Sequence, residues 1–264
     1  MMKKMKYISL VIILAISWPI LLNAEITYPQ RNLEADLTYD YLTPDRDYVD
    51  WKSVEAKYFH KFNPGNTLLM ATGVSIRDES LGWVQAAYYK DWTQRLYTYT
   101  SLKAATESYW MGNLRLDNDI NLKLGRDFQY ILVAGQSVIY HNEDKIDYIL
   151  SVGGLLYKPH YVLEGRYFFN RSDPGAIWSN AVMASVGFGT QGKYWTTVTA
   201  TTGAQAYLAQ ANLMEVNQNV YSVQLNQRIW VKSGSGLKFG LGYMNVEDGY
   251  EKYNFSVGWF TRLP

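Results

Sequence analysis

The feature that most constrains this chain is an alternation of apolar and polar residues through its last segment, 251–263. From Tyr253, every second residue is apolar or aromatic, continuing through Phe255, Val257 and Trp259. Because side chains of a β-strand point alternately to opposite faces, this segment is predicted to be a strand with one apolar face. The same period of two recurs almost to the start of the chain. It indicates a sheet protein whose apolar faces meet either a core or a lipid bilayer.

The composition is rich in aromatic residues and nearly neutral in charge. The 264 residues include 23 Tyr, 9 Trp and 9 Phe, and both strands and membrane–water interfaces favour such side chains. The 25 basic and 24 acidic residues leave a formal charge of +1, so nothing in the charge indicates nucleic-acid binding. The chain has no cysteine, which excludes a disulfide framework, a thiolate metal site and a cysteine nucleophile.

Residues 1–24 have the pattern of a secretory signal peptide. They begin with lysines, continue as an apolar run over residues 7–22 and end on the small residue Ala24. The alternative is a membrane anchor, but this run is short for a spanning helix and is broken by Ser and Pro. We therefore expect export, cleavage of the signal peptide near Ala24, and a mature domain of residues 25–264.

About fourteen segments carry the two-residue period at roughly the nine to eleven residues that a tilted membrane strand needs. The predicted strands are 32–41, 51–62, 68–76, 81–91, 95–105, 113–125, 128–140, 145–157, 161–170, 177–188, 193–202, 220–231, 237–246 and 251–263. Some hairpins are weakly patterned, so twelve or sixteen strands are the alternatives. The polar face of segment 113–125 carries charged residues in succession, which would be costly in a dry core and indicates a wet surface.

The connections between these strands tend to alternate in length. Turns on one side are short and rich in breakers, as in Asn63-Pro64-Gly65-Asn66. Several connections on the other side are longer and more polar, namely 43–50, 106–112, 170–176 and above all 203–219. Others on that side are short, so the contrast is imperfect. Short periplasmic turns and longer extracellular loops, with both chain termini on the side of the short turns, are typical of bacterial outer-membrane barrels.

We therefore predict an all-β fold, a single antiparallel transmembrane β-barrel in the outer membrane of a Gram-negative bacterium. A soluble sandwich usually has shorter strands and would have to bury the aromatic residues at the strand ends. A propeller would need a blade-length repeat, which this sequence does not show. In the barrel, Tyr253, Phe255, Val257 and Trp259 face lipid. Their strand is expected to pair with 32–41, which closes the sheet and removes both of its edges.

Charged residues on the polar faces of the strands are expected to line the lumen. The set is Glu34, Asp36, Glu55, Lys57, Arg77, Arg115, Asp117, Asp119, Lys123, Asp147, Glu164, Arg166 and Arg228. Both signs are present in similar number, so the lumen is either plugged by its own ion pairs or a narrow polar pore that filters solutes. Phe168, Met183, Trp230 and Met244 are also expected to point inward, which favours a narrow or plugged lumen.

No catalytic site, metal site or cofactor is predicted. Barrel enzymes that cut or transfer acyl chains need a His near a Ser. A Ser is not found two positions from any of the three histidines, which are His60, His141 and His160. The acidic residues after His141 are interpreted as a solvated turn. The G-x-G-x-x-G spacing at 187–192 leads into a strand, whereas a phosphate-binding loop leads into a helix.

Two segments resemble a known family. Asn118-Asp119-Ile120-Asn121-Leu122 and Glu164-Gly165-Arg166-Tyr167-Phe168, with the order of hairpins between them, resemble the YaiO-like outer-membrane β-barrel proteins. The resemblance extends over most of the mature chain and implies an outer-membrane barrel without an enzymatic site. Outer-membrane proteins commonly finish on an aromatic residue that the insertion machinery reads. Because this sequence continues to Pro264, we expect Trp259 or Phe260 to substitute.

The predicted function is that of a non-enzymatic outer-membrane protein, either a narrow or gated conduit or a structural protein of the envelope. The first alternative is a barrel whose surface loops, above all 203–219, bind a partner or a surface glycan. The second is an envelope-lipid hydrolase or acyltransferase. The expected partners are outer-membrane lipids, lipopolysaccharide and, during assembly, the barrel-insertion machinery. We expect no nucleic-acid partner, and we expect a monomer.

Overall fold

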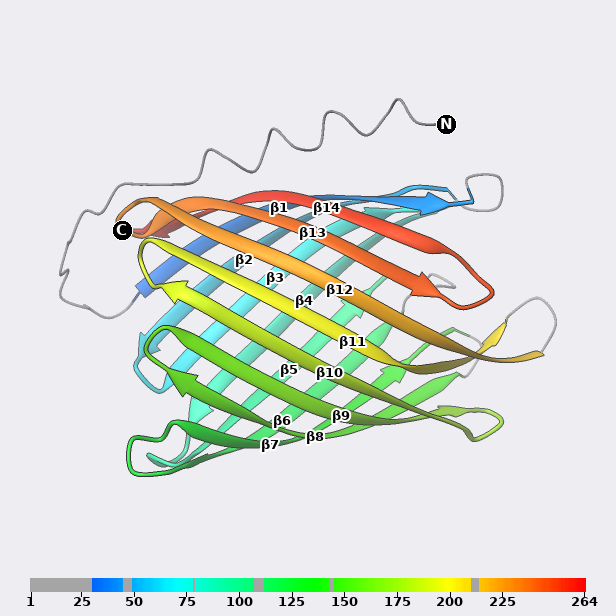
Figure 1. The fold of residues 1–264 in the computed structure, drawn as a ribbon, viewed down its shortest axis with the longest axis horizontal. Helices are drawn as coiled ribbons and strands as arrows, with labels where there is room; N and C mark the ends of the chain where they lie inside the picture. Colours follow the sequence, from blue (N-terminus) through cyan, green and yellow to red (C-terminus); the bar gives the residue numbers. More distant parts are fainter. Residues whose placement is uncertain (1–29, 45–48, 78, 107–111, 143–144, 210–213) are drawn as a thin grey trace.

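A computed structural model describes residues 30–264 except 45–48, 78, 107–111, 143–144 and 210–213. Fourteen strands follow one another in chain order, each antiparallel to its neighbours, and form one closed barrel (Figure 1). The signal peptide predicted for residues 1–24 lies outside the described residues. No helix in the described part of the chain is long and apolar enough to cross a membrane.

Every predicted strand is present, and several extend beyond their predicted bounds. The strands are β1 (Gln30–Thr43), β2 (Trp51–Asn63), β3 (Asn66–Ile76), β4 (Ser80–Asp91), β5 (Leu96–Ala105), β6 (Leu114–Leu124), β7 (Tyr130–Tyr140), β8 (Ile146–Lys158), β9 (Tyr161–Asp173), β10 (Ile177–Thr190), β11 (Tyr194–Ala209), β12 (Met214–Lys232), β13 (Ser235–Val246) and β14 (Glu251–Leu263). The predicted number of fourteen is confirmed. The glycine-rich segment 187–192 covers the end of β10 and the turn into β11, as its flanking strand patterns predict.

The barrel closes where β14 pairs with β1. The register begins with Arg31 opposite Leu263 and ends with Thr43 opposite Glu251. This pairing confirms the predicted contact between the first and last strands and leaves the sheet without a free edge. We call the end of the barrel where β1 begins and β14 ends the terminal rim, and the opposite end the far rim.

Two connections at the far rim differ from the predicted loops. Segment 203–219 is largely strand, because β11 and β12 stay paired until Ala209 lies opposite Met214. Strand β9 likewise extends into segment 170–176. The prediction of long loops at these two places was wrong. The residues there do not alternate regularly between apolar and polar, but their backbone groups are still satisfied by hairpin pairing.

Large apolar side chains cover the outside of the barrel. Tyr253, Phe255, Val257 and Trp259 of β14 are between 37% and 50% exposed, and every other strand also carries an exposed large apolar residue. An apolar surface that surrounds a whole barrel would be unfavourable in water and is solvated by lipid tails in a bilayer. The polar face of each strand consequently points inward.

One sector of the interior is apolar. Ala71 of β3 and Leu81 and Trp83 of β4 form a buried cluster, and Ala105 of β5 packs against it. The Trp83 ring lies against Gly73, where an added Cβ would come within 2.7 Å of the ring atoms. Glycine at this position therefore allows the ring to fill part of the lumen between β3 and β5.

Candidate functional site in the barrel lumen

Contacts between strands that are not neighbours place charged side chains inside the barrel. Arg166 of β9 reaches Asp119 of β6 at 3.0 Å, although β7 and β8 lie between those strands in the sheet. Arg228 of β12 contacts Glu34 of β1 past β13 and β14. Such contacts can form only across the concave inner face of the sheet. Ion pairs therefore cross part of the lumen.

One group of these charges lies on β5, β6 and β9, and we call it the cavity wall. Its members are Lys103, Arg115, Asp117, Asp119, Glu164 and Arg166. Strand β6 supplies three of them because its polar residues occupy successive inward positions, while Leu116 and Ile120 between them point outward and are 45% and 51% exposed. The same strand also carries Asn121 and Lys123 on its inner face, so its inner side is polar throughout.

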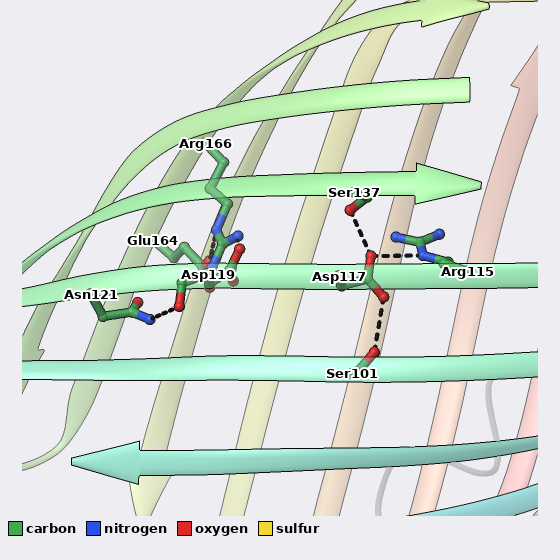
Figure 2. Close-up of polar contacts among 8 residues, drawn as sticks. All are labelled: Ser101, Arg115, Asp117, Asp119, Asn121, Ser137, Glu164 and Arg166. Carbon is green, nitrogen blue, oxygen red and sulfur yellow. Dashed lines mark hydrogen bonds and ion pairs between the residues drawn. The ribbon is translucent and has the colours of Figure 1, made fainter. Parts of the chain in front are cut away.

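Asp117 is held from three sides. Its carboxylate accepts hydrogen bonds from Ser101 Oγ on β5 (2.9 Å), Ser137 Oγ on β7 (2.6 Å) and Arg115 Nε on its own strand (2.8 Å) (Figure 2). Hydrogen bonds to an ionised carboxylate are stronger than those between neutral groups. The two serines therefore link the neighbouring strands to Asp117. With three hydrogen bonds accepted, the carboxylate has little capacity to accept more.

Arg166 binds two carboxylates at once. Its Nη1 donates to Asp119 Oδ2 at 3.0 Å, and its Nε donates to Glu164 Oε1 at 2.9 Å. Figure 2 shows the guanidinium extending from β9 toward the side chains of β6, over the strands between them. The Arg166 side chain therefore narrows the lumen at the level of Asp119.

A cavity of about 600 Å³ lies beside these charges. Its lining comprises Gln85, Tyr99, Lys103, Arg115, Asp117, Asp119, Ser137, Ile149, Ser151, Arg166, Phe168, Asn170 and Ala181. Sites for small molecules in proteins usually have volumes of roughly 300–1,000 Å³. The cavity therefore has room for a small solute, and most of its lining side chains are polar or charged.

A second group of charges lies on β1, β12, β13 and β14, and we call it the paired wall. Its members are Glu34, Asp36, Asp40, Arg228, Lys238 and Lys252. Lys238 Nζ lies 2.8 Å from Glu34 Oε2 and 2.6 Å from Asp36 Oδ2, and the Glu34 side chain is only 8% exposed. Lys252 pairs with Asp40 at 3.7 Å. Each charge of the paired wall thus has a partner of opposite sign.

The remaining predicted lumen charges make contacts of their own. The pairs are Glu55 with Lys57, Lys123 with Asp91, Arg77 with the face of the Trp51 ring, and Asp147 with His141. The acidic residues that follow His141 lie outside the described residues. Within the described ranges, no group of three His, Asp or Glu side chains could hold a metal ion.

Four charged residues of the two walls were not predicted as lumen residues, namely Asp40, Lys103, Lys238 and Lys252. The alternation indicates the inward position of Lys238 clearly, because its neighbours Leu237 and Phe239 are exposed on the outer face. The corresponding signal for Lys103 is weaker, since only one of its two neighbours, Leu102, is a large apolar residue, whereas Ala104 is small.

Comparison with known proteins identifies the fold. The family model described as the YaiO membrane beta barrel domain matches residues 30–208. No curated protein sequence matches the chain. Among solved structures, the chain is similar to the CymD monoaromatic hydrocarbon channel, with a TM-score of 0.59 and 6% identity over 90% of this chain and 89% of that one.

Two further solved structures have the same architecture. A bacterial polysaccharide outer membrane secretin gives a TM-score of 0.53 and 9% identity over 90% of this chain and 99% of that one. The translocator domain of autotransporter NalP from Neisseria meningitidis gives a TM-score of 0.51 and 12% identity over 90% of each chain. At these identities the likeness shows the outer-membrane barrel fold alone.

Proposed function

Because the chain belongs to the YaiO membrane β-barrel domain family, it is an outer-membrane β-barrel, and we propose that it is a narrow, non-enzymatic conduit for small polar solutes. The observation that carries this proposal is the cavity of about 600 Å³ within the lumen, lined largely by charged and polar side chains. In the proposed orientation, the terminal rim faces the periplasm and the far rim faces the outside.

A continuous polar surface along β6 supports passage through the lumen. Every inward position from Arg115 to Lys123 is charged or an amide. Because a strand rises about 3.4 Å per residue and membrane strands are tilted by roughly 40°, these positions extend over about 27 Å of the strand and about 20 Å of the bilayer normal, which is about two thirds of the hydrocarbon core. A small hydrated solute on this surface would find a polar partner at each step.

The side chains that enter the lumen support a narrow passage. Arg166 crosses toward β6, and Trp83 fills the sector next to β5. A barrel of eight strands is filled by its own side chains, whereas porins of 16–18 strands leave an aqueous channel. Fourteen strands lie between these limits, and bulky inward residues reduce the remaining space further.

The contacts of two histidines support a non-enzymatic role. His60 Nδ1 lies 3.1 Å from Tyr58 Oη, and His141 Nε2 lies 2.8 Å from Asp147 Oδ2. Neither contact places a nucleophilic Ser against the ring, as acyl transfer by a His–Ser pair would require.

We also propose that the barrel acts as a monomer and that its apolar outer surface contacts outer-membrane lipid.

Single-channel recording in planar bilayers tests the conduit. We expect the wild-type protein to give small, discrete conductance steps and Arg166→Met to give larger ones, because the side chain that crosses the lumen is shortened and uncharged. Arg171→Met is the matched control. Arg171 is on the same strand, forms a 3.2 Å ion pair with Asp173, and does not line the cavity. A wild-type protein that stays silent in the bilayer would refute the conduit.

Partner binding by the β11–β12 hairpin is a second candidate function. These strands have 16 and 19 residues and extend past most of the barrel at the far rim (Figure 1). Shortening this hairpin by removal of residues 205–218 should leave a heat-modifiable barrel with unchanged conductance. It should also abolish adhesion of cells that display the protein. If adhesion is unaffected, the hairpin is not the binding element.

A further inference from the structure

Two basic side chains of the cavity wall face one another near the far rim. Lys103 of β5 lies directly opposite Arg115 of β6 in the strand register, and both line the cavity. Like charges in this position repel one another. Asp117 is the acid of the cavity wall beside them, so among the described residues that line this end of the cavity two cations and one carboxylate leave one excess positive charge.

The acids nearest to this pair are already engaged. Asp117 accepts hydrogen bonds from two serines as well as from Arg115. Glu55, on the inner face of β2, is paired with Lys57. Lys103 Nζ lies 4.2 Å from the centre of the Trp83 ring, and no carboxylate among the described residues is within ion-pair distance of it.

Both basic groups retain hydrogen-bond donors for a ligand. Arg115 uses its Nε for Asp117, and its side chain is 43% exposed, so the two Nη groups remain available. Lys103 contributes three ammonium donors next to them. Guanidinium and ammonium groups bind carboxylate and phosphate oxygens through strong charge-assisted hydrogen bonds. We propose that Lys103 and Arg115 form a binding site for a small oxyanion, either a carboxylate or a phosphate, at the far-rim end of the cavity.

The deeper part of the cavity has the opposite balance of charge. There Arg166 is shared between Asp119, which lines the cavity, and Glu164, which does not, so one cation and two carboxylates leave one excess negative charge around the guanidinium among the described residues. The oxyanion is therefore held beside Lys103 and Arg115 and is repelled from the level of Arg166. This site specifies the class of solute that the proposed conduit would carry. It rests on that proposal only because it requires a lumen that solutes can reach.

Isothermal titration of the folded, full-length barrel in detergent tests the site directly. Sodium phosphate and sodium acetate are titrated separately at low ionic strength, and sodium chloride is the reference titrant. We expect at least one oxyanion to bind more tightly than chloride. Lys103→Met and Arg115→Gln should each weaken its binding by about tenfold, because each removes a charged donor. Arg115→Lys, which keeps the charge, should retain most of the affinity.

Lys90→Met is the matched control, because Lys90 also lies over a tryptophan ring, that of Trp92 at 3.8 Å, but does not line the cavity. The Lys90→Met variant should bind the oxyanion with the same affinity as the wild type. Heat-modifiable migration in gels confirms that each variant is folded. The site is refuted if wild type binds neither oxyanion, or if the folded Lys103→Met and Arg115→Gln variants bind as tightly as wild type.

The two oxyanions identify the ligand, and conductance separates the two proposals. Tight binding of phosphate alone indicates phosphorylated solutes, and binding of acetate indicates carboxylates. Anion binding by a barrel that is silent in the bilayer would refute the conduit and retain the site. Conductance without anion binding would refute the site and retain the conduit.

Discussion

The cavity wall and the paired wall are built from the same residue types in one lumen, but their charges are satisfied differently. In the paired wall, Lys238 bridges Glu34 and Asp36, and the Glu34 side chain is 8% exposed. In the cavity wall, Arg115 is 43% exposed and Lys103 lies against a tryptophan ring. The paired wall joins strands to one another, whereas the cavity wall leaves donors beside open space. Inward charge alone therefore does not indicate a binding site; incompletely paired charge beside a cavity does.

Strands β10 and β11 lie between the two walls in the sheet. Ser185 of β10 and Thr199 of β11 face each other on the inner surface, with their hydroxyl oxygens 3.0 Å apart. These hydroxyl groups form a hydrogen bond without adding charge, so this position between the two walls holds no partner for an ion pair. In Figure 1, β1 and β14 lie at the top of the barrel and β6 to β8 at the bottom.

The largest expected effect tests whether the paired wall is structural. Lys238→Met leaves two carboxylates without their shared cation, and removal of one partner of a buried pair typically costs about 3 kcal/mol or more. We expect a loss of that size in the free energy of unfolding, measured by denaturant titration of the barrel in lipid or detergent. Lys57→Met is the control, because Lys57 is 32% exposed and pairs with Glu55. Equal losses in the two variants would show that Lys238 has no special role.

A smaller effect tests whether packing holds the cavity wall. Gly73→Ala places a methyl group against the Trp83 ring, which must move, and overpacking of this kind costs about 2 kcal/mol. Because Lys103 lies over that ring, the variant should also weaken oxyanion binding. Gly165→Ala is the control, since nothing lies within 4 Å of its added Cβ. Unchanged stability and binding in Gly73→Ala would show that the ring does not position Lys103.

The smallest effect tests the serines that hold Asp117. Ser137→Ala removes one hydrogen bond to that carboxylate, and we expect a loss of about 1 kcal/mol in the free energy of unfolding. Ser185→Ala, which removes a bond between two neutral hydroxyls, should cost less. Should the two substitutions prove equal, the charge of Asp117 adds nothing to the strength of its hydrogen bonds.

The alternation of residues was sufficient to predict the strands, their number and the closure between β1 and β14. The direction of a side chain in a strand is a local property, because successive residues point to opposite faces. The same rule assigns Asp117, Asp119 and Arg166 to the inner face. It also assigns Lys238 to that face, although this residue is not among the predicted lumen charges. Loop lengths were less predictable, since a hairpin such as β11–β12 can stay paired where its residues no longer alternate between apolar and polar.

The pattern of residues along the chain is enough to specify an outer-membrane barrel with a polar inner face, because strand direction and the need to satisfy every backbone group in lipid follow from local pattern. Which charges meet depends on how the closed barrel folds. Arg166 and Asp119 are 47 residues apart, and Arg228 and Glu34 are 194 apart. These pairs form because closure curves the sheet until strands that are not neighbours face each other. The same curvature leaves Lys103 and Arg115 beside the cavity, where the proposed oxyanion would bind.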